Sequence, residues 1–249
     1  MKQAYLYIDY EMFKLKDLEI LNSKEQLKTL PKGKLLINTI NAHSFNTAKK
    51  DKLFAEALTH GDVLIPDGVS IVKACRKMKA KSQPKERIAG WDLFEFEMDQ
   101  LDKLENKTVM FMGSSQKVLD LIVKRAAIVY PHLKVVTYSP PYKPEFSEED
   151  NRAIINAINV ANPDLLWIGM TAPKQEKWTY SHWAELDIHC HVGTIGAVFD
   201  FFAGTVERAP MWWQRHGLEW LYRLLKEPKR MWRRYIIGNA LFLWNMTKE

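Results

Sequence analysis

Polar side chains that could do acid–base chemistry on a hydroxyl group follow two short apolar runs of this chain. Thr39 and Asn41 stand at the end of the run 35–40, and Asp67 comes just after the run 62–65. A carboxylate at the end of a strand can accept a proton, while a hydroxyl and an amide beside it can orient a substrate. Asp67 also precedes an expected helix, so an N-cap is the structural alternative for its carboxylate.

Other polar residues stand where a phosphate group could bind. Gly113 and Ser114 open an expected helix, whose backbone N–H groups can bind an anion, although a Gly-Ser turn is also an ordinary connection. Gln175 and Glu176 lie in the first turn of another expected helix, where they either contact a ligand or only suit the helix dipole. The run GTIG (193–196) is too short to be a dinucleotide fingerprint.

The last part of the chain combines tryptophan with positive charge. Five of the nine tryptophans lie between Ala209 and Trp244, and the stretch from Arg208 to Arg234 has eight Lys or Arg against two acids. This composition favours a helical appendage on an anionic membrane, and an ordinary amphipathic helix pair packed on the body is the alternative. The residues expected to face the membrane are Trp212, Trp213, Arg215, Trp220 and Trp232.

Alternating strands and helices must position these groups. The expected strands are 35–40, 62–65, 108–112, 134–138, 164–168 and 188–192, and the expected helices are 46–59, 69–79, 93–104, 116–130, 148–161 and 174–185. This order predicts an α/β fold with a Rossmann-like, mostly parallel sheet flanked by helices, whose ligands bind beyond the carboxyl ends of the strands. We expect a catalytic domain over 1–205 and a membrane-associating helical appendage over 206–249, in which Pro228 separates two helices.

Composition narrows the class of protein. Hydrophobic residues make up 47% of the 249 residues, enough for a full core, and the net charge of +6 indicates phosphate-bearing partners. Two cysteines are too few for a disulfide framework, and the N-terminal residues lack the apolar core of a signal peptide. The longest apolar run, 235–244, is shorter than the roughly 20 residues of a spanning helix. We expect a cytoplasmic protein, peripheral on the inner face of the cell membrane.

Taken together, the short polar and apolar segments of this chain resemble those of the WecG/TagA/CpsF family of bacterial glycosyltransferases, glycosyltransferase family 26. The resemblance covers roughly residues 35–235. Its segments are TIN (39–41), DVLIPDG (62–68), ERIAGWD (86–92), MG (112–113), PD (163–164), APKQE (172–176), FDFFAG (199–204), RAP (208–210) and GLEWLYRLL (217–225). The last three in tandem are highly specific to the family, whereas GTIG (193–196) departs slightly from its usual small-residue run.

The resemblance implies an inverting transfer of a sugar from a UDP-sugar donor to a polyprenyl-diphosphate-linked acceptor in the synthesis of bacterial surface polysaccharide. The donor sugar stays open among N-acetylmannosamine, its uronic acid and glucose. Asp67 matches the family's proposed catalytic aspartate, and we place Thr39 and Asn41 beside it. The remaining substrate-binding residues are expected to be Arg87 at a hydroxyl or carboxyl group, Gly113, Ser114, Gln175 and Glu176 at the nucleotide, and Arg223, Arg230 and Arg233 at the departing diphosphate. For the three tail arginines, binding to lipid headgroups alone is the alternative.

Neither a cofactor nor a metal is expected, because the chain has no Asp-x-Asp motif to anchor Mg²⁺ or Mn²⁺ at a diphosphate. A Rossmann oxidoreductase is excluded, since the first strand is not followed by Gly-x-Gly-x-x-Gly. The alternative function is a basic nucleotide- or nucleic-acid-binding protein without transferase activity. Nucleic acid is not an expected partner, because the basic residues concentrate in a lipid-like tail. The oligomeric state stays open, with a homo-oligomer as one option.

Overall fold

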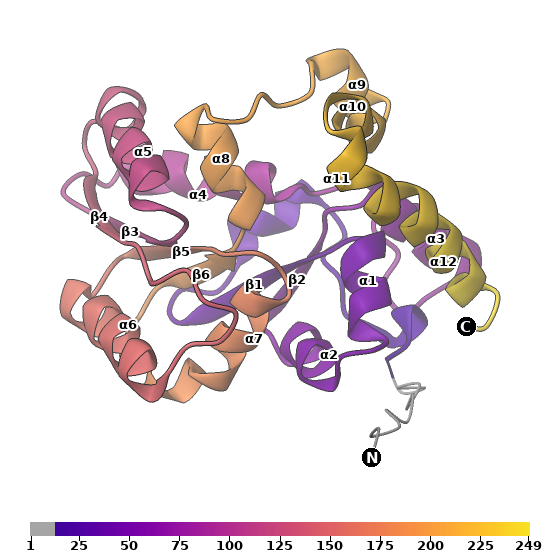
Figure 1. Cartoon of the computed structure of the whole chain (residues 1–249), viewed down its shortest axis with the longest axis horizontal. Helices are drawn as coiled ribbons and strands as arrows, with labels where there is room; N and C mark the ends of the chain where they lie inside the picture. The colour runs from indigo at the N-terminus through magenta and orange to yellow at the C-terminus, as the bar shows by residue number, and fades with distance from the viewer. Residues whose placement is uncertain (1–12) are drawn as a thin grey trace.

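One six-stranded sheet organises the molecule, for which the computed structural model describes residues 13–249 (Figure 1). The strands are β1 (Leu35–Ile40), β2 (Val63–Pro66), β3 (Thr108–Gly113), β4 (Lys134–Tyr138), β5 (Leu165–Gly169) and β6 (His191–Thr194), in the spatial order β2-β1-β6-β5-β3-β4. Each neighbouring pair is parallel, so the carboxyl ends of the strands share one edge. The predicted Rossmann-like α/β fold is confirmed. Most of the N-terminal stretch that we examined for a signal peptide lies outside the described residues.

Helices cover both faces of this sheet, and a helical tail follows them (Figure 1). The helices of the body are α1 (Ala42–Ala48), α2 (Lys52–Thr59), α3 (Val69–Met78), α4 (Gly90–Asp102), α5 (Gln116–Val129), α6 (Glu148–Ala161), α7 (Lys174–Ser181) and α8 (Gly196–Ala203). The tail, residues 209–249, contains α9 (Met211–Arg215), α10 (Glu219–Lys226), α11 (Pro228–Trp232), a π-helical turn (Arg233–Ile237) and α12 (Gly238–Met246). Short 3-10 turns lie at Leu15–Asp17, Lys24–Thr29 and Trp183–Glu185.

Strand alternation divides the core between the two faces of the sheet. Phe111 and Trp167 are fully buried on the face covered by α4, α5 and α8. Their neighbours Met110 and Ile168 are buried on the opposite face, beneath α6 and α7. Successive side chains of a strand point to opposite faces, so strands covered on both sides are apolar throughout. This explains why the apolar runs of the sequence located these strands.

Four predicted elements differ from the structure by several residues. The predicted helix 93–104 is displaced toward the N-terminus, since α4 runs from Gly90 to Asp102. The predicted helix 46–59 is wrong, because α1 and α2 are separate helices and the Asp51 carboxylate starts the second by accepting from the Phe54 N–H. The predicted helix 174–185 ends early, since α7 stops at Ser181 and a 3-10 turn follows. The predicted strand 188–192 is displaced toward the C-terminus. Gly193 of β6 pairs with Trp167 of β5, and a Cβ on Gly193 would lie 2.3 Å from the Trp167 indole ring.

The tail is fastened to the body through its last helix. In Figure 1, α12 runs alongside α1 after the chain has left α8 through an extended segment. Phe242 of α12 is buried and meets the Phe45 ring edge-to-face, with 5.6 Å between the ring centroids. The division of the chain at residue 205 stays a prediction. Within residues 13–249, none of the helices has both the length and the apolar character needed to cross a bilayer.

Candidate active site

Asp67 follows β2 at the carboxyl edge of the sheet, and an arginine holds it there. The N-cap of α3 is Gly68, and no side chain caps this helix, so the N-cap alternative for Asp67 is wrong. Arg87 instead donates through Nε to the Asp67 carbonyl oxygen at 2.5 Å and through Nη2 to Oδ1 at 3.2 Å. The Asp67 side chain keeps 28% of its surface exposed, so its carboxylate remains accessible at the edge of the sheet.

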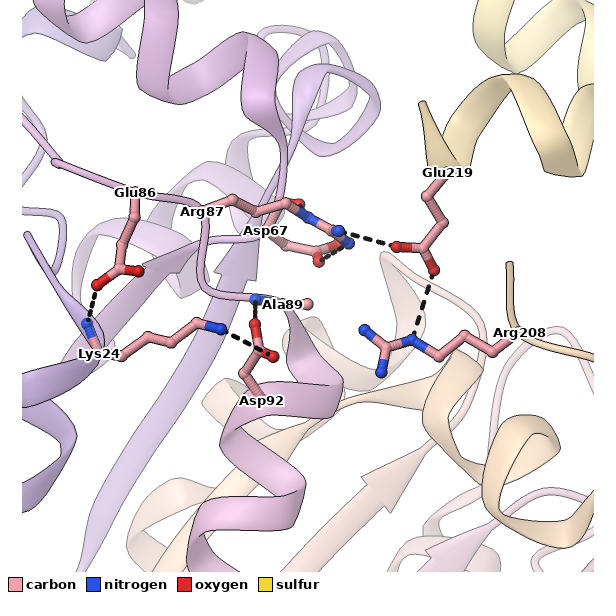
Figure 2. Close-up of polar contacts among 8 residues, drawn as sticks. All are labelled: Lys24, Asp67, Glu86, Arg87, Ala89, Asp92, Arg208 and Glu219. Atoms are coloured by element: carbon pink, nitrogen blue, oxygen red, sulfur yellow. Dashed lines mark hydrogen bonds and ion pairs between the residues drawn. The ribbon is translucent and has the colours of Figure 1, made fainter. Parts of the chain in front are cut away.

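The tail reaches the same arginine from the opposite side (Figure 2). Arg87 Nη1 donates to Oε2 of Glu219, the first residue of α10, at 2.8 Å. Arg208 Nε lies 3.8 Å from Oε1 of the same carboxylate. Burial lowers the pKa of Arg87, but the charges of Asp67 and Glu219 outweigh it and raise this pKa above its ordinary value. The guanidinium therefore stays charged between the two carboxylates.

The segment ERIAGWD (86–92) is built to hold Arg87 in this position (Figure 2). Glu86 accepts the backbone N–H of Lys24 at 2.9 Å, and the Lys24 ammonium lies 3.1 Å from Asp92 Oδ1. Asp92 Oδ2 also accepts the Ala89 N–H at 2.7 Å, at the start of α4. Hydrogen bonds and an ion pair thus restrain both ends of the segment, at Glu86 and Asp92, and limit the movement of the Arg87 backbone between them.

Thr39 and Asn41 lie at the end of the strand next to Asp67. Asn41 caps α1, because its Oδ1 accepts the backbone N–H groups of residues 43 and 44 at 3.0 and 3.1 Å. A Cβ on Gly68 would stand 3.1 Å from the Asn41 Cβ, so the loops after β1 and β2 touch. Thr39 is half-buried and pairs with Ile65 of β2. The structure brings Thr39, Asn41 and Asp67 together, and their roles in chemistry stay predictions.

The Gly113–Ser114 turn lies at the ends of β3 and β5. Gly113 has φ +119° and approaches β5 so closely that a Cβ would lie 2.4 Å from the Gly169 carbonyl oxygen. The Ser114 carbonyl oxygen accepts the Ser139 hydroxyl at 2.9 Å, and Ser115 rather than Ser114 caps α5. Gly113 is buried and Ser114 is half-buried, whereas Ser115 and Gln116 at the start of α5 are exposed. Nucleotide binding here stays a prediction.

Gln175 and Glu176 are both buried at the start of α7. The Gln175 amide accepts the Met170 N–H at 3.1 Å and donates to Glu176 Oε1 at 2.9 Å, which fixes the connection from β5 to α7. Burial raises the pKa of Glu176 to about 7, and its Oε2 has no hydrogen-bond partner among residues 13–249. The first turn of α7 is therefore a packed polar cluster rather than a solvated helix end. Contacts of either residue with a nucleotide stay a prediction.

The three arginines assigned to the diphosphate differ in their surroundings. Arg223 is half-buried above the Phe201 ring, at 5.5 Å from its centroid, and lies one helical turn after Glu219, on the side of α10 that meets the body. Arg230 is exposed and pairs with Glu227 at 2.8 Å, and Arg233 is exposed over the ring of its neighbour Trp232. In the described part of the chain, no hydrogen bond or ion pair joins Arg230 or Arg233 to Asp67 or Arg87.

The tryptophans expected at the membrane lie on the outer side of the tail. Trp212, Trp220 and Trp232 have exposed fractions of 57%, 37% and 42%, and Arg215 is exposed as well. Trp213 is half-buried and meets Trp212 edge-to-face at 5.7 Å. Further apolar residues of the tail are exposed as well, namely Met211, Leu225, Ile236, Ile237, Leu243 and Trp244.

Sequence reasoning missed Glu219 and Arg208 as parts of the site. The signal that could have revealed Glu219 is its negative charge, because it is one of only two acids in the basic stretch 208–234. It also missed His43, which lies in the first turn of α1. Burial and the charge of Arg234 lower the pKa of His43 to about 4. Among residues 13–249, no group of three or more His, Cys, Asp or Glu side chains could hold a metal ion.

Comparison with known proteins shows the family of this chain. A model described as the Glycosyl transferase WecG/TagA/CpsF family matches residues 10–249. The chain belongs to this family. It is a glycosyltransferase, and the alternative of a binding protein without transferase activity is wrong.

The chain is similar to two proteins that share the name N-acetylglucosaminyldiphosphoundecaprenol N-acetyl-beta-D-mannosaminyltransferase. The protein from Bacillus subtilis (strain 168) is 31% identical over 201 residues, which are 81% of this chain and 75% of the relative. The protein from Bacillus spizizenii (strain ATCC 23059 / NRRL B-14472 / W23) is 31% identical over 205 residues, which are 82% and 76% of the two chains.

Proposed function

We propose that this glycosyltransferase moves a sugar from a UDP-sugar to a polyprenyl-diphosphate-linked sugar, with inversion, in the synthesis of bacterial surface polysaccharide. The observation that carries the proposal is the Asp67 carboxylate, held by Arg87 at the carboxyl edge of the sheet and bordered by a tail rich in arginine. The name shared by the two relatives supports an acceptor on a polyprenyl diphosphate, because it specifies a sugar diphosphoundecaprenol.

In the proposed reaction, Asp67 accepts the proton of the acceptor hydroxyl as its oxygen attacks the anomeric carbon of the donor sugar. The new glycosidic bond forms on the face opposite the leaving group, while the bond between C1 and the diphosphate oxygen breaks. The anomeric configuration inverts and UDP leaves. Thr39 and Asn41, at the adjacent strand end, would orient the sugar whose hydroxyl or anomeric carbon reacts.

Charge on the departing diphosphate would be offset by protein cations. Arg223 is the best placed, because it lies on the same side of α10 as Glu219, which contacts the site. Arg230 and Arg233 would complete the set by contacting the exposed end of the diphosphate. The nucleotide would lie along the strand ends that carry Gly113, Ser114, Gln175 and Glu176, and no cofactor takes part.

The tail would also hold the enzyme at the inner face of the cytoplasmic membrane, where a polyprenyl-linked acceptor resides. Its outer surface offers indole rings (Trp212, Trp213, Trp220, Trp232) and basic side chains such as Arg215, the combination that binds anionic headgroups. The enzyme would then be cytoplasmic and peripheral.

N-Acetylmannosamine is the donor sugar we propose among the three that the family suggests, since both relatives are named for it. The test is UDP release with a panel of UDP-N-acetylmannosamine, its uronic acid and UDP-glucose, measured with and without a lipid-diphosphate-N-acetylglucosamine acceptor. The expected result is release that requires both UDP-N-acetylmannosamine and the acceptor. Preference for another UDP-sugar would reject the donor, and no acceptor-dependent release with any of the three would reject the reaction.

A further inference from the structure

The Arg87 guanidinium joins two carboxylates that come from distant parts of the chain (Figure 2). Three of its N–H groups are used, two for Asp67 at 2.5 and 3.2 Å and one for Glu219 at 2.8 Å. All three side chains are largely withdrawn from solvent, with exposed fractions of 28% for Asp67, 22% for Arg87 and 12% for Glu219. Ion pairs in such surroundings are screened less than pairs on the surface, so the contacts constrain one another.

We propose that Glu219 is a positioning residue for Asp67: acting through Arg87, it makes the geometry of the proposed base depend on a docked tail. This inference rests on the proposed function, in which Asp67 accepts the proton. Glu219 does not itself touch the acceptor in this scheme. Its role is to fix the guanidinium that fixes the Asp67 carboxylate.

The geometry indicates how Glu219 would restrict the guanidinium that holds Asp67. The contact from Arg87 Nη2 to Asp67 Oδ1 is the longest of the three at 3.2 Å, whereas the contact from Nη1 to Glu219 is short. Loss of the Glu219 charge would free Nη1 and allow the guanidinium to turn about its bond to the Asp67 carbonyl. The Asp67 carboxylate would then lose its fixed direction toward the acceptor, and small misplacements of a reacting group lower rates strongly.

Arg208 gives Glu219 a second cation and ties the pair to the start of the tail. Arg208 Nε lies 3.8 Å from Glu219 Oε1, and its guanidinium stacks over Trp91 at 5.2 Å from the ring centroid. Trp91 belongs to the same segment, 86–92, as Arg87. Glu219 therefore contacts this segment directly at Arg87, and its second partner, Arg208 just before the tail, contacts the segment at Trp91. Docking of the tail and the position of Arg87 are linked in this way.

The first experiment compares Glu219→Gln with Glu207→Gln in the full chain, using a soluble acceptor analogue. Glutamine keeps a hydrogen-bond acceptor and similar size but removes the charge. We expect Glu219→Gln to lower kcat by roughly 10- to 100-fold with little change in KM for the UDP-sugar, because positioning rather than donor binding is impaired. Glu207 is the control, since it lies on the approach to the tail with its side chain 74% exposed and contacts only tail residues.

Two further measurements separate positioning from loss of the tail. Binding to anionic vesicles should equal that of the unsubstituted protein, because Glu219→Gln leaves the outer tryptophans intact. Glu219→Asp retains the charge on a shorter side chain and should recover part of the lost turnover. Equal kcat values for Glu219→Gln and Glu207→Gln would overturn the inference, as would loss of vesicle binding in Glu219→Gln together with the lower rate.

A double-mutant cycle with Asp67→Asn provides the decisive measurement. If Glu219 acts through Asp67, Glu219→Gln should cost almost nothing further once the base is gone, measured in single turnovers. Additive losses would overturn the inference. Normal turnover of Asp67→Asn alone would instead reject the base assignment in the proposed function, so the two failures are distinguishable.

Discussion

The inner and outer sides of the tail use the same kinds of residue in opposite ways. On the inner side, Glu219 and Arg208 are paired and largely withdrawn from solvent, and Arg223 packs on Phe201. On the outer side, tryptophans and basic side chains stay exposed. Of the large hydrophobic side chains exposed in the described residues, nine lie in the tail and six in the much longer body. One side is therefore suited to docking on the site, and the other to a partner outside the chain.

The body and the tail also differ in what stabilises their helices. Side chains cap α1, α2, α5 and α6 in the body, whereas no side chain caps any of the described tail helices. In α9 and α10, both within the described residues, no side chain is fully buried. Because α9 and α10 are short and have no side-chain caps, they depend on contacts with the body or with another surface.

Deletion of the tail should have the largest effect, because it removes both sides at once. A chain that ends at Arg208 should bind neither anionic vesicles nor the diphosphate, and transfer to a soluble acceptor analogue should be abolished. Circular dichroism must show that the body stays folded, since Phe242 packs on Phe45. Full-length turnover by the truncated protein would make the tail an anchor only.

Asp67→Asn tests the proposed general base, which lies in the body next to the inner side of the tail. Asparagine keeps the shape and can still accept from Arg87, but it cannot take the acceptor proton. Turnover should fall by roughly 10²–10⁴ while circular dichroism shows that the protein stays folded. A well-folded variant with near-normal turnover would leave Asp67 only a partner of Arg87.

Arg230→Ala and Arg233→Ala test whether outward-facing arginines also serve the chemistry. Each variant should lose roughly 10²–10³ in kcat on the soluble analogue, as is typical of a lost charge-stabilising donor, and should keep most vesicle binding. Lys229→Ala is a matched control, because Lys229 is an exposed neighbour on α11. Weaker vesicle binding at full catalytic rate would instead support the lipid-headgroup alternative.

Replacement of Trp212 and Trp213 by Ala should weaken membrane binding without lowering the catalytic rate, the opposite of the result expected for the arginine variants. Each buried indole contributes on the order of 1–3 kcal/mol of interfacial affinity, so sedimentation with anionic vesicles should weaken. Rates on the soluble analogue should stay nearly unaltered, because neither ring contacts Asp67, Arg87 or Glu219 in the described contacts. A lower rate with intact vesicle binding would place these rings at the site.

Chelation should have the smallest effect. The chain has no Asp-x-Asp motif, and the proposed cations for the diphosphate are arginines of the tail. Transfer measured in EDTA should therefore equal transfer in Mg²⁺. Activity that disappears with EDTA and returns with Mg²⁺ or Mn²⁺ would contradict metal-independent transfer.

Local pattern alone was enough to predict the sheet and most of its helices. Strands covered on both faces are continuous apolar runs, as in Phe111 and Trp167, and such runs can be located without knowing their neighbours. The position of Asp67 and Asn41 at a common edge also followed, because parallel strands end together. Helix boundaries were predicted less well where a cap such as Asp51 restarts a helix within an apparently continuous pattern.

By itself, the sequence determined the fold class, the family and the residue types available for chemistry, because these depend on periodicity and on short segments. Only the tertiary structure decided the partners of those residues. It paired Arg87 with Glu219, 132 positions away, and it gave the Asp67 carboxylate to Arg87 rather than to the N-terminus of α3. Such choices depend on how separate elements pack, since a carboxylate caps a helix or binds an arginine according to which group lies within hydrogen-bond reach.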